Sequence, residues 1–264
     1  MVDLRVDPAN PKHVFAVTRF AGAAKIWRLG PANGFSQWVS ITGDFPFNLG
    51  VSTIFVDWQY SIPALWVGSA RGVYHSVNLG QNWSKFALDL PNTNVSDLQS
   101  LSSKNVLAAA TSGRSVFEIF IKPSKISGSA VQDPGNVPMV GAKVFLDTSG
   151  NGSPDANEYQ IAIDAQGHFQ FAKVPPGTYT PRIVVAAGLV QSAASTKKVT
   201  VNGSDMQVSL VVQTERMQIP LGLQIYSKAI QLLPGQTEEM PAAAVGEFDE
   251  VRREREQVGL TSAV

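Results

Sequence analysis

A run of oxygen-bearing side chains between residues 147 and 158 has the spacing of a calcium-binding loop. With Asp147 as the first position, Asn151 is the fifth, Gly152 the sixth and Glu158 the twelfth. This order follows the pattern Asp-x-[Asp/Asn]-x-[Asp/Asn]-Gly-x5-Glu except at the third position. Ca²⁺ takes six to eight oxygen ligands, and the glycine allows the sharp turn that brings them together. We therefore predict a Ca²⁺ site with these ligands: Asp147, Ser149, Asn151, the backbone carbonyl of Ser153, Asp155 and Glu158.

The predicted site is weaker than a full calcium loop. Ser149 is uncharged and stands where the pattern has Asp or Asn, so only three carboxylates remain. A dissociation constant of about 10⁻⁴–10⁻³ M, as in extracellular calcium modules, is expected. The alternative is a turn rich in Gly, Asn and Asp that binds no metal.

Other chemistry finds little support in the residue types. The chain has no Cys, which excludes disulfides, thiol nucleophiles and Cys-ligated zinc. Glycoside hydrolysis needs two carboxylates facing each other. The candidates lie at turns, caps or strand ends and are interpreted as structural: Asp57, Asp89, Asp97 and Glu118. We predict no catalytic and no cofactor-binding residue.

Composition limits the partners. Lys plus Arg equals 21 and Asp plus Glu equals 21, so the net charge is zero, and a nucleic-acid partner is not expected. The apolar runs are shorter than the roughly 18 residues of a membrane span. Hydrophobic residues make up 44% of the chain, enough to build packed cores.

The predicted structural elements begin with a repeat over residues 1–121. Short alternating segments at 2–6, 51–56 and 95–98 are each followed by two further short strands, and Trp83 follows Trp38 by 45 residues. Alternation of this kind predicts β-strands. A four-stranded unit of about 45 residues has the size of one blade of a β-propeller.

One turn in this region carries a family resemblance. Ser76, Asn78, Gly80 and Trp83 resemble the Asp-box, Ser-x-Asp-x-Gly-x-x-Trp, with Asn in place of Asp. Asn78 is expected to bond nearby amides, Gly80 to adopt a positive φ and Trp83 to plug the hairpin. The resemblance implies an Asp-box propeller of the sortilin-like or sialidase-like kind, of which this chain holds about 2.5 blades. A longer parent chain would supply the remaining blades.

Residues 126–213 follow a second pattern. About seven segments alternate like strands, as in an immunoglobulin-like sandwich. The order Ile126-x-Gly-x-x-Val131, then 141–147 (Gly-Ala-x-Val-Phe-Leu-Asp), then 164–171 (Asp-x-x-Gly-x-Phe-x-Phe), resembles the B-type module of serine-aspartate-repeat adhesins. That resemblance implies a cell-surface module and supports calcium.

The predicted fold class is all-β: a partial β-propeller plus an immunoglobulin-like β-sandwich, with an irregular or helical tail. The predicted domains are blades over 1–121, a linker over 122–125, the sandwich over 126–213, and a tail over 214–264, partly disordered with a charged helix.

The expected function is a non-enzymatic, secreted or cell-surface (bacterial-type) binding and spacer protein with an unidentified protein or glycan ligand. The alternative is a fragment of a glycan-processing hydrolase whose catalytic residues lie mostly outside this chain.

Overall fold

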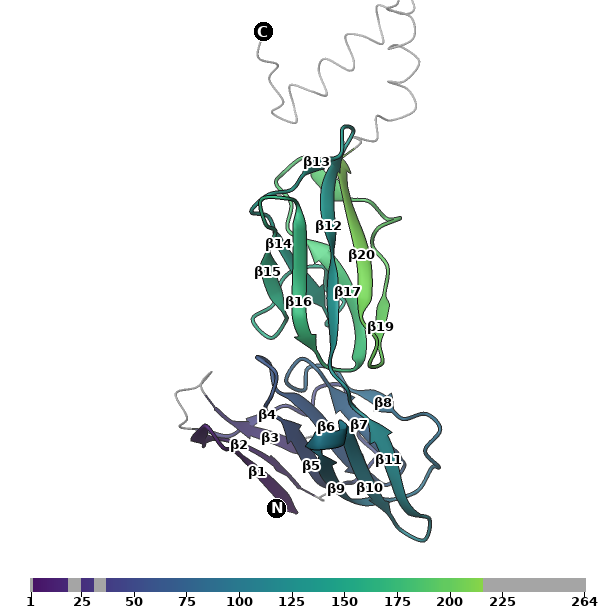
Figure 1. The fold of residues 1–264 in the computed structure, drawn as a ribbon. Coiled ribbons are helices and arrows are strands. Elements are labelled where there is room, and N and C mark those ends of the chain that lie inside the picture. The colour runs from purple at the N-terminus through teal and green to yellow at the C-terminus, as the bar shows by residue number, and fades with distance from the viewer. Residues whose placement is uncertain (1, 19–24, 31–36, 216–264) are drawn as a thin grey trace, which may run out of the picture. The chain divides into compact units, whose positions relative to one another are not determined.

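The computed structural model describes residues 2–18, 25–30 and 37–215, and in these ranges the fold is all-β as predicted (Figure 1). The helical content of the described residues is one short 3-10 turn, Ser102–Lys104. None of the described residues forms a helix long and apolar enough to cross a membrane. Residues up to Glu215 form one compact unit. The predicted tail lies outside the described residues from position 216 onward.

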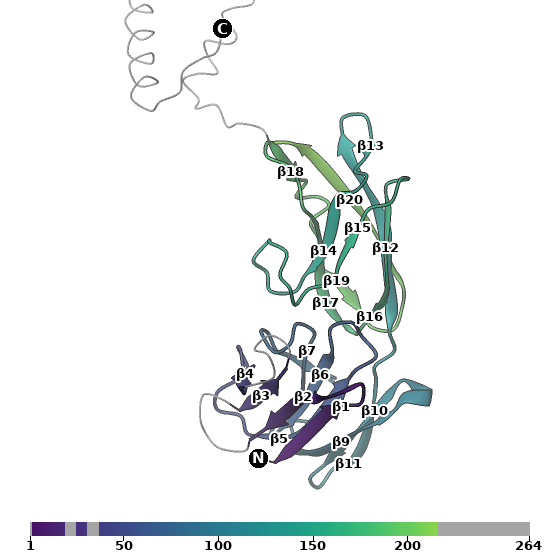
Figure 2. The same ribbon diagram turned by 90° about the vertical axis from the view of Figure 1, so that its left-hand side faces the viewer.

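The N-terminal half forms three antiparallel sheets, each running up and down in chain order (Figures 1 and 2). The first contains β1 (Asp3–Asp7), β2 (Asn10–Val17), β3 (Ile26–Leu29) and β4 (Val39–Ser40). The second contains β5 (Val51–Asp57), β6 (Ala64–Ser69), β7 (Gly72–Ser76) and β8 (Ser84–Phe86). The third contains β9 (Val95–Leu101), β10 (Val106–Thr111) and β11 (Ser115–Phe120).

Alternation along the strands places the apolar side chains of the middle sheet on both of its faces. On one face Ile54 and Leu65 pack with Phe15 of the first sheet. On the other face Trp66 packs with Leu107 of the third sheet. The middle sheet is therefore buried on both sides, which explains why every residue of β6 is buried.

A polar contact fixes the first sheet to the second. The Asp3 carboxylate accepts hydrogen bonds from the Thr53 hydroxyl at 2.8 Å and the Ile54 amide at 3.0 Å. A carboxylate bonded in this way is a strong acceptor, so the contact sets the stagger of the two sheets.

The C-terminal half is a sandwich of two sheets. One sheet contains β12 (Ser124–Asp133), β13 (Val137–Pro138), β16 (His168–Val174), β18 (Leu189–Gln191) and β20 (Met206–Thr214). The other contains β14 (Lys143–Asp147), β15 (Gln160–Ala162), β17 (Gly177–Ile183) and β19 (Val199–Val201). β12 and β20 pair in parallel, and the other pairs are antiparallel.

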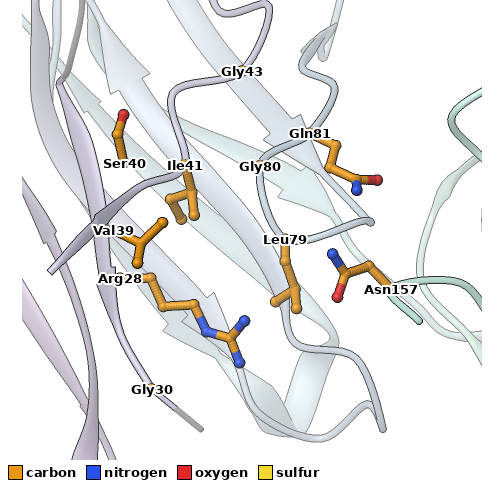
Figure 3. A pocket seen from close by; sticks show the side chains of 10 residues that line it. All are labelled: Arg28, Gly30, Val39, Ser40, Ile41, Gly43, Leu79, Gly80, Gln81 and Asn157. Carbon is orange, nitrogen blue, oxygen red and sulfur yellow. The ribbon is translucent and has the colours of Figure 1, made fainter. Parts of the chain in front are cut away.

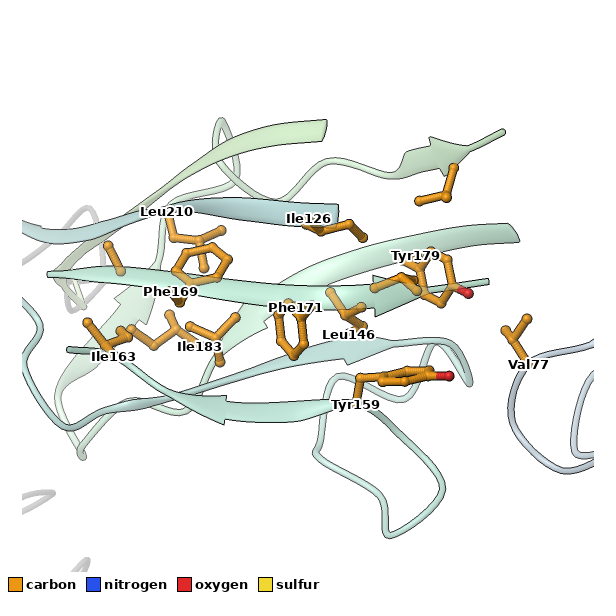
Figure 4. Close-up of a cluster of buried hydrophobic side chains, with 14 of the residues drawn as sticks. Val77, Ile126, Leu146, Tyr159, Ile163, Phe169, Phe171, Tyr179, Ile183 and Leu210 are labelled. Atoms are coloured by element: carbon orange, nitrogen blue, oxygen red, sulfur yellow. The ribbon is translucent and has the colours of Figure 1, made fainter. Parts of the chain in front are cut away.

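The core of the sandwich lies between these sheets (Figure 4). Phe169 and Phe171 of β16 face inward with ring centroids 6.1 Å apart. Tyr179 of β17 is fully buried, and its hydroxyl donates to the Pro175 carbonyl at 2.8 Å.

The connection between the halves is shorter than the predicted linker of residues 122–125. β12 begins at Ser124, which pairs with Val174 of β16 and is buried. Three residues therefore separate the end of β11 at Phe120 from the start of β12. Lys125 also has a partner in the sandwich, since its amide donates to the Asp205 carboxylate.

Candidate functional site

The predicted calcium loop connects β14 to β15. Phe145 pairs with Gln160, and the Leu146 amide donates to the Tyr159 carbonyl at 2.9 Å. The two ends of the loop are therefore held side by side by the sheet, which lets its first and last acidic residues face each other across the loop.

Asp147 is buried at the start of the loop, with 3% of its surface exposed. Its Oδ1 accepts from the Gly150 amide at 2.6 Å, and its Oδ2 accepts from the Gly152 amide at 3.1 Å. Arg182 of β17 donates from Nε to the same Oδ2 at 2.7 Å. The side chain thus organises the loop backbone and is also half of an ion pair.

Glu158 closes the loop and is equally buried, at 4% exposed. Its Oε1 accepts from the amides of Thr148 at 2.8 Å and Ser149 at 3.1 Å, and its Oε2 accepts from the Asp155 amide at 3.2 Å. Among the salt bridges of the described residues, none involves Glu158. Backbone amides and the Thr148 hydroxyl, which donates to Oε1 at 3.2 Å, satisfy this buried carboxylate.

The middle of the loop is exposed and turns sharply. Asn151 Nδ2 donates to Asp155 Oδ2 at 3.0 Å, and the Ser153 amide donates to Asn151 Oδ1 at 2.8 Å. Gly152 has a φ of +76°, the left-handed conformation that glycine adopts most readily. The predicted role of this glycine in the turn is confirmed.

The structure brings the predicted ligands together in pairs. Asp147 lies near the Ser149 hydroxyl, at 3.5 Å, and Asn151 contacts Asp155. Within the described ranges, no group of three or more His, Cys, Asp or Glu side chains is placed to share one metal ion. Ca²⁺ binding at this loop therefore stays a prediction, and it requires the side chain of Asp155 to turn toward the carboxylates of Asp147 and Glu158.

Sequence reasoning did not find Arg182. It lies 35 residues after Asp147, and only the pairing of β14 with β17 places the two side chains together. No local pattern signals such a contact, because it depends on which strands are neighbours.

The turn that resembles an Asp-box has a structural role. Asn78 Oδ1 accepts from the Asn82 amide at 3.0 Å, and Gly80 has a φ of +83°. Trp83 is 7% exposed and its indole nitrogen donates to the Ile41 carbonyl of the neighbouring sheet at 3.2 Å. The predicted roles of these three residues are confirmed, and the turn fastens the second sheet to the first.

The four carboxylates weighed for hydrolysis lie at the end of β5, in the third sheet or in a turn. Asp57 accepts from the amide and the side chain of Gln59, as a turn residue does. Asp97 accepts from the Leu98 amide. Glu118 is exposed on β11, and Asp89 lies in a turn between β8 and β9.

A cavity of about 340 Å³ lies where β3, β4 and the Leu79–Gln81 turn meet (Figure 3). Val39, Ile41 and Leu79 form an apolar wall, and Arg28 and Asn157 line it as well. Among the described residues, Arg28 is the one charged side chain in the lining, and its Nε donates to His13 Nε2 at 3.0 Å. The lining that the structure describes contains no pair of carboxylates of the kind a glycosidase uses.

The contact between the N-terminal sheets and the sandwich, called the joint below, contains further buried polar groups. The Tyr159 hydroxyl donates to the Ile62 carbonyl at 3.2 Å, and Val77 joins the sandwich core (Figure 4). Burial lowers the pKa of His75 to about 4, while the carbonyls of Ser84 and Pro176 oppose the shift. At neutral pH this histidine is therefore uncharged.

No family of proteins matches the chain, and no curated protein does. Similar solved structures are pilins and extracellular domains. The major pilin subunit of Bacillus cereus is 14% identical over 42% of this chain and 37% of its own, with a TM-score of 0.28. A streptococcal ancillary pilin is 17% identical over 45% of this chain and 40% of its own, with a TM-score of 0.31.

The extracellular domain of a hybrid two-component system of B. thetaiotaomicron is 9% identical over 84% of this chain and 31% of its own, with a TM-score of 0.32. The chain spans two fifths or less of the length of these three proteins. TM-scores of this size assign no family, so the function is inferred below from the chain's own residues.

Proposed function

We propose that this chain is a non-enzymatic binding and spacer segment of a secreted or cell-surface protein. In this proposal the three N-terminal sheets are blades of a larger Asp-box propeller that presents a protein or glycan ligand. The sandwich is a calcium-stabilised stalk resembling the adhesin B-type module. The observation that supports it best is the joint between the two halves.

The joint holds the two halves together by packing as well as by the chain connection. Val77, directly after β7, is part of the sandwich core, and Ile62 packs against the same cluster. The Tyr159 hydroxyl adds a buried hydrogen bond to the Ile62 carbonyl. Burial of apolar side chains on both sides of a short connection restricts hinge motion, which suits a spacer that must hold a binding domain at a fixed distance.

Calcium is supported by the charge and the donors of the 147–158 loop. Asp147, Asp155 and Glu158 carry three negative charges, and Arg182 offsets one of them. A net charge of −2 remains, and two of the carboxylates are almost fully buried. Buried charge that lacks a counter-charge is costly, and a divalent cation bound by these oxygens would remove that cost. The ion pair of Arg182 with Asp147 competes with the ion, in keeping with a weak site.

Thermal unfolding of the chain with EDTA and with Ca²⁺ tests the proposal. At a Ca²⁺ concentration ten times the dissociation constant, binding to the folded state alone adds about 1.4 kcal/mol to the free energy of unfolding. We expect the melting temperature to rise with Ca²⁺ up to about 10 mM for the wild type and to stay constant for Glu158→Gln.

Glu118→Gln is the matched control, since Glu118 is an exposed glutamate outside the loop, and it should respond like the wild type. An equal response of all three proteins to Ca²⁺, or the absence of any response in the wild type, would show that the loop is an ordinary turn.

A further inference from the structure

Within the described ranges, the third sheet has no counterpart of the strand that completes the other two. β4 pairs with β3, and β8 pairs with β7, so the first two sheets each have four strands. β11 occupies the corresponding position in the third sheet, and within the described ranges it pairs with β10 alone. The chain leaves β11 at Phe120 and enters β12 at Ser124, so it passes directly into the sandwich where the other two sheets turn back.

The backbone shows that β7 and β11 are equivalent strands. Arg71 and Gly72 precede Val73 in β7, and Arg114 and Ser115 precede Val116 in β11. Gly72 has a φ of +109°, and Ser115 has a φ of +71° even though it carries a side chain. Because this conformation is uncommon for residues other than glycine, its presence directly before Val73 and Val116 supports the alignment of the two strands.

The free edge of β11 presents backbone groups in the order that a further strand requires. The Ile121 amide donates to the Asn105 carbonyl at 2.9 Å, so this residue bonds inward to the neighbouring chain segment. Backbone groups alternate in direction along an antiparallel strand. Those of Val116, Glu118 and Phe120 therefore point away from β10, and in the described part of the chain they have no strand partner.

The side chains along this edge are exposed where their equivalents are buried. Val73 of β7 is fully buried, whereas Val116 is 61% exposed. His75 of β7 is 8% exposed and lies 4.6 Å from the Phe86 ring of β8. Phe120, farther along β11, is 72% exposed. β11 thus has apolar residues at positions that are buried in β7, but in β11 these residues are exposed.

We propose that the edge of β11 accepts a fourth, antiparallel strand from another polypeptide. The sister sheet defines the chemistry of that strand. Val73 pairs with Phe86, and His75 pairs with Ser84, so the incoming strand has an apolar residue opposite Val116. Glu118 stands at the position of His75, and an opposite charge across a strand pair is stabilising. The strand therefore carries Lys or Arg opposite Glu118.

A second copy of this chain fits the edge less well. Two β11 strands that pair with each other around Glu118 place two glutamates directly opposite, which is destabilising. Edge pairing with a peptide of a different sequence avoids this repulsion, and the main-chain bonds supply the affinity. This inference does not depend on calcium or on the identity of the propeller ligand.

Amide hydrogen exchange, resolved by residue in NMR spectra of the full chain, tests the proposal with two synthetic peptides. Both copy residues 81–88, which contain β8. One carries Ser84→Lys and the other Ser84→Glu, so that the changed residue lies opposite Glu118. We expect the lysine peptide to slow exchange at Val116, Glu118 and Phe120 by at least tenfold when saturating, and to bind several-fold more tightly than the glutamate peptide.

The variant Glu118→Lys supplies the matched control. Glu118 is exposed, so the fold should be retained, and the preference should reverse in favour of the glutamate peptide. Failure of both peptides to protect these three amides at millimolar concentration would overturn the proposal. So would protection of the amides in the monomeric chain without peptide, or protection that rises with protein concentration, because the chain or a second copy would then supply the strand.

Discussion

The three N-terminal sheets and the sandwich bury their apolar side chains in different ways. The sandwich closes its core between two sheets, and its exposed large hydrophobic residues are Val137, Val140 and Val184. The N-terminal sheets pack in a row, so the middle sheet is covered twice and the outer two only once. Among the described residues of these sheets and their loops, the exposed large hydrophobic ones are Val2, Leu4, Val6, Trp38, Val39, Phe47, Leu88, Leu101, Val116 and Phe120. A row of sheets that does not close leaves apolar surface at its ends, whereas a sandwich is complete by itself.

The largest expected effect compares one buried and one exposed phenylalanine. Phe169→Ala should lower the free energy of unfolding by about 3–5 kcal/mol, because it leaves a cavity in the sandwich core. Phe120→Ala, on the free edge of β11, should change it by less than about 0.5 kcal/mol. Chemical denaturation of both variants measures the difference. A large loss for Phe120→Ala would show that the third sheet is already covered in solution.

The second-largest expected effect is a loss of stability at low pH, caused by His75 at the joint. Burial lowers the pKa of His75 to about 4 in the folded chain, whereas the unfolded chain has an ordinary histidine near 6.5. The unfolded state therefore binds more protons between these values, so stability is full above about pH 6.5 and declines as the pH falls toward 4.

Between pH 7 and pH 4.5 the loss due to His75 should be about 2–3 kcal/mol. Urea unfolding at both pH values, for the wild type and for His75→Gln, isolates this contribution. The two proteins differ only at position 75, so the informative quantity is the difference between their pH dependences. Equal pH dependence in the two would show that water reaches His75 and that the joint is open.

The smallest effect tests how tightly the two halves are coupled. Tyr159→Phe removes the hydrogen bond to the Ile62 carbonyl and should cost about 1 kcal/mol, since one buried acceptor loses its donor. Tyr74→Phe is the control, because the Tyr74 hydroxyl makes no hydrogen bond within the described ranges. Calorimetry that resolves one transition in the wild type and two in Tyr159→Phe would show that this bond joins the halves into one cooperative unit.

Several local features of the chain could be predicted because neighbouring residues decide them. The strand alternation predicts an all-β fold, and the 45-residue spacing locates the repeated sheets. Gly80 has the predicted positive φ, and Gly152, which was predicted to allow a sharp turn, has a positive φ as well. The strand starting at Ser124 began earlier than predicted, since its partner in β16 is 50 residues away and gives no local signal.

In the candidate site, too, some features follow from the sequence and others only from the tertiary structure. The spacing from Asp147 to Glu158 by itself determined that one loop carries three carboxylates, because a loop of fixed length keeps its residues within reach of each other. Only the tertiary structure decided that Arg182 neutralises Asp147 and that backbone amides hold Glu158. It also decided that β11 pairs with β10 alone among the described residues, because strand pairing joins residues that are far apart in the chain.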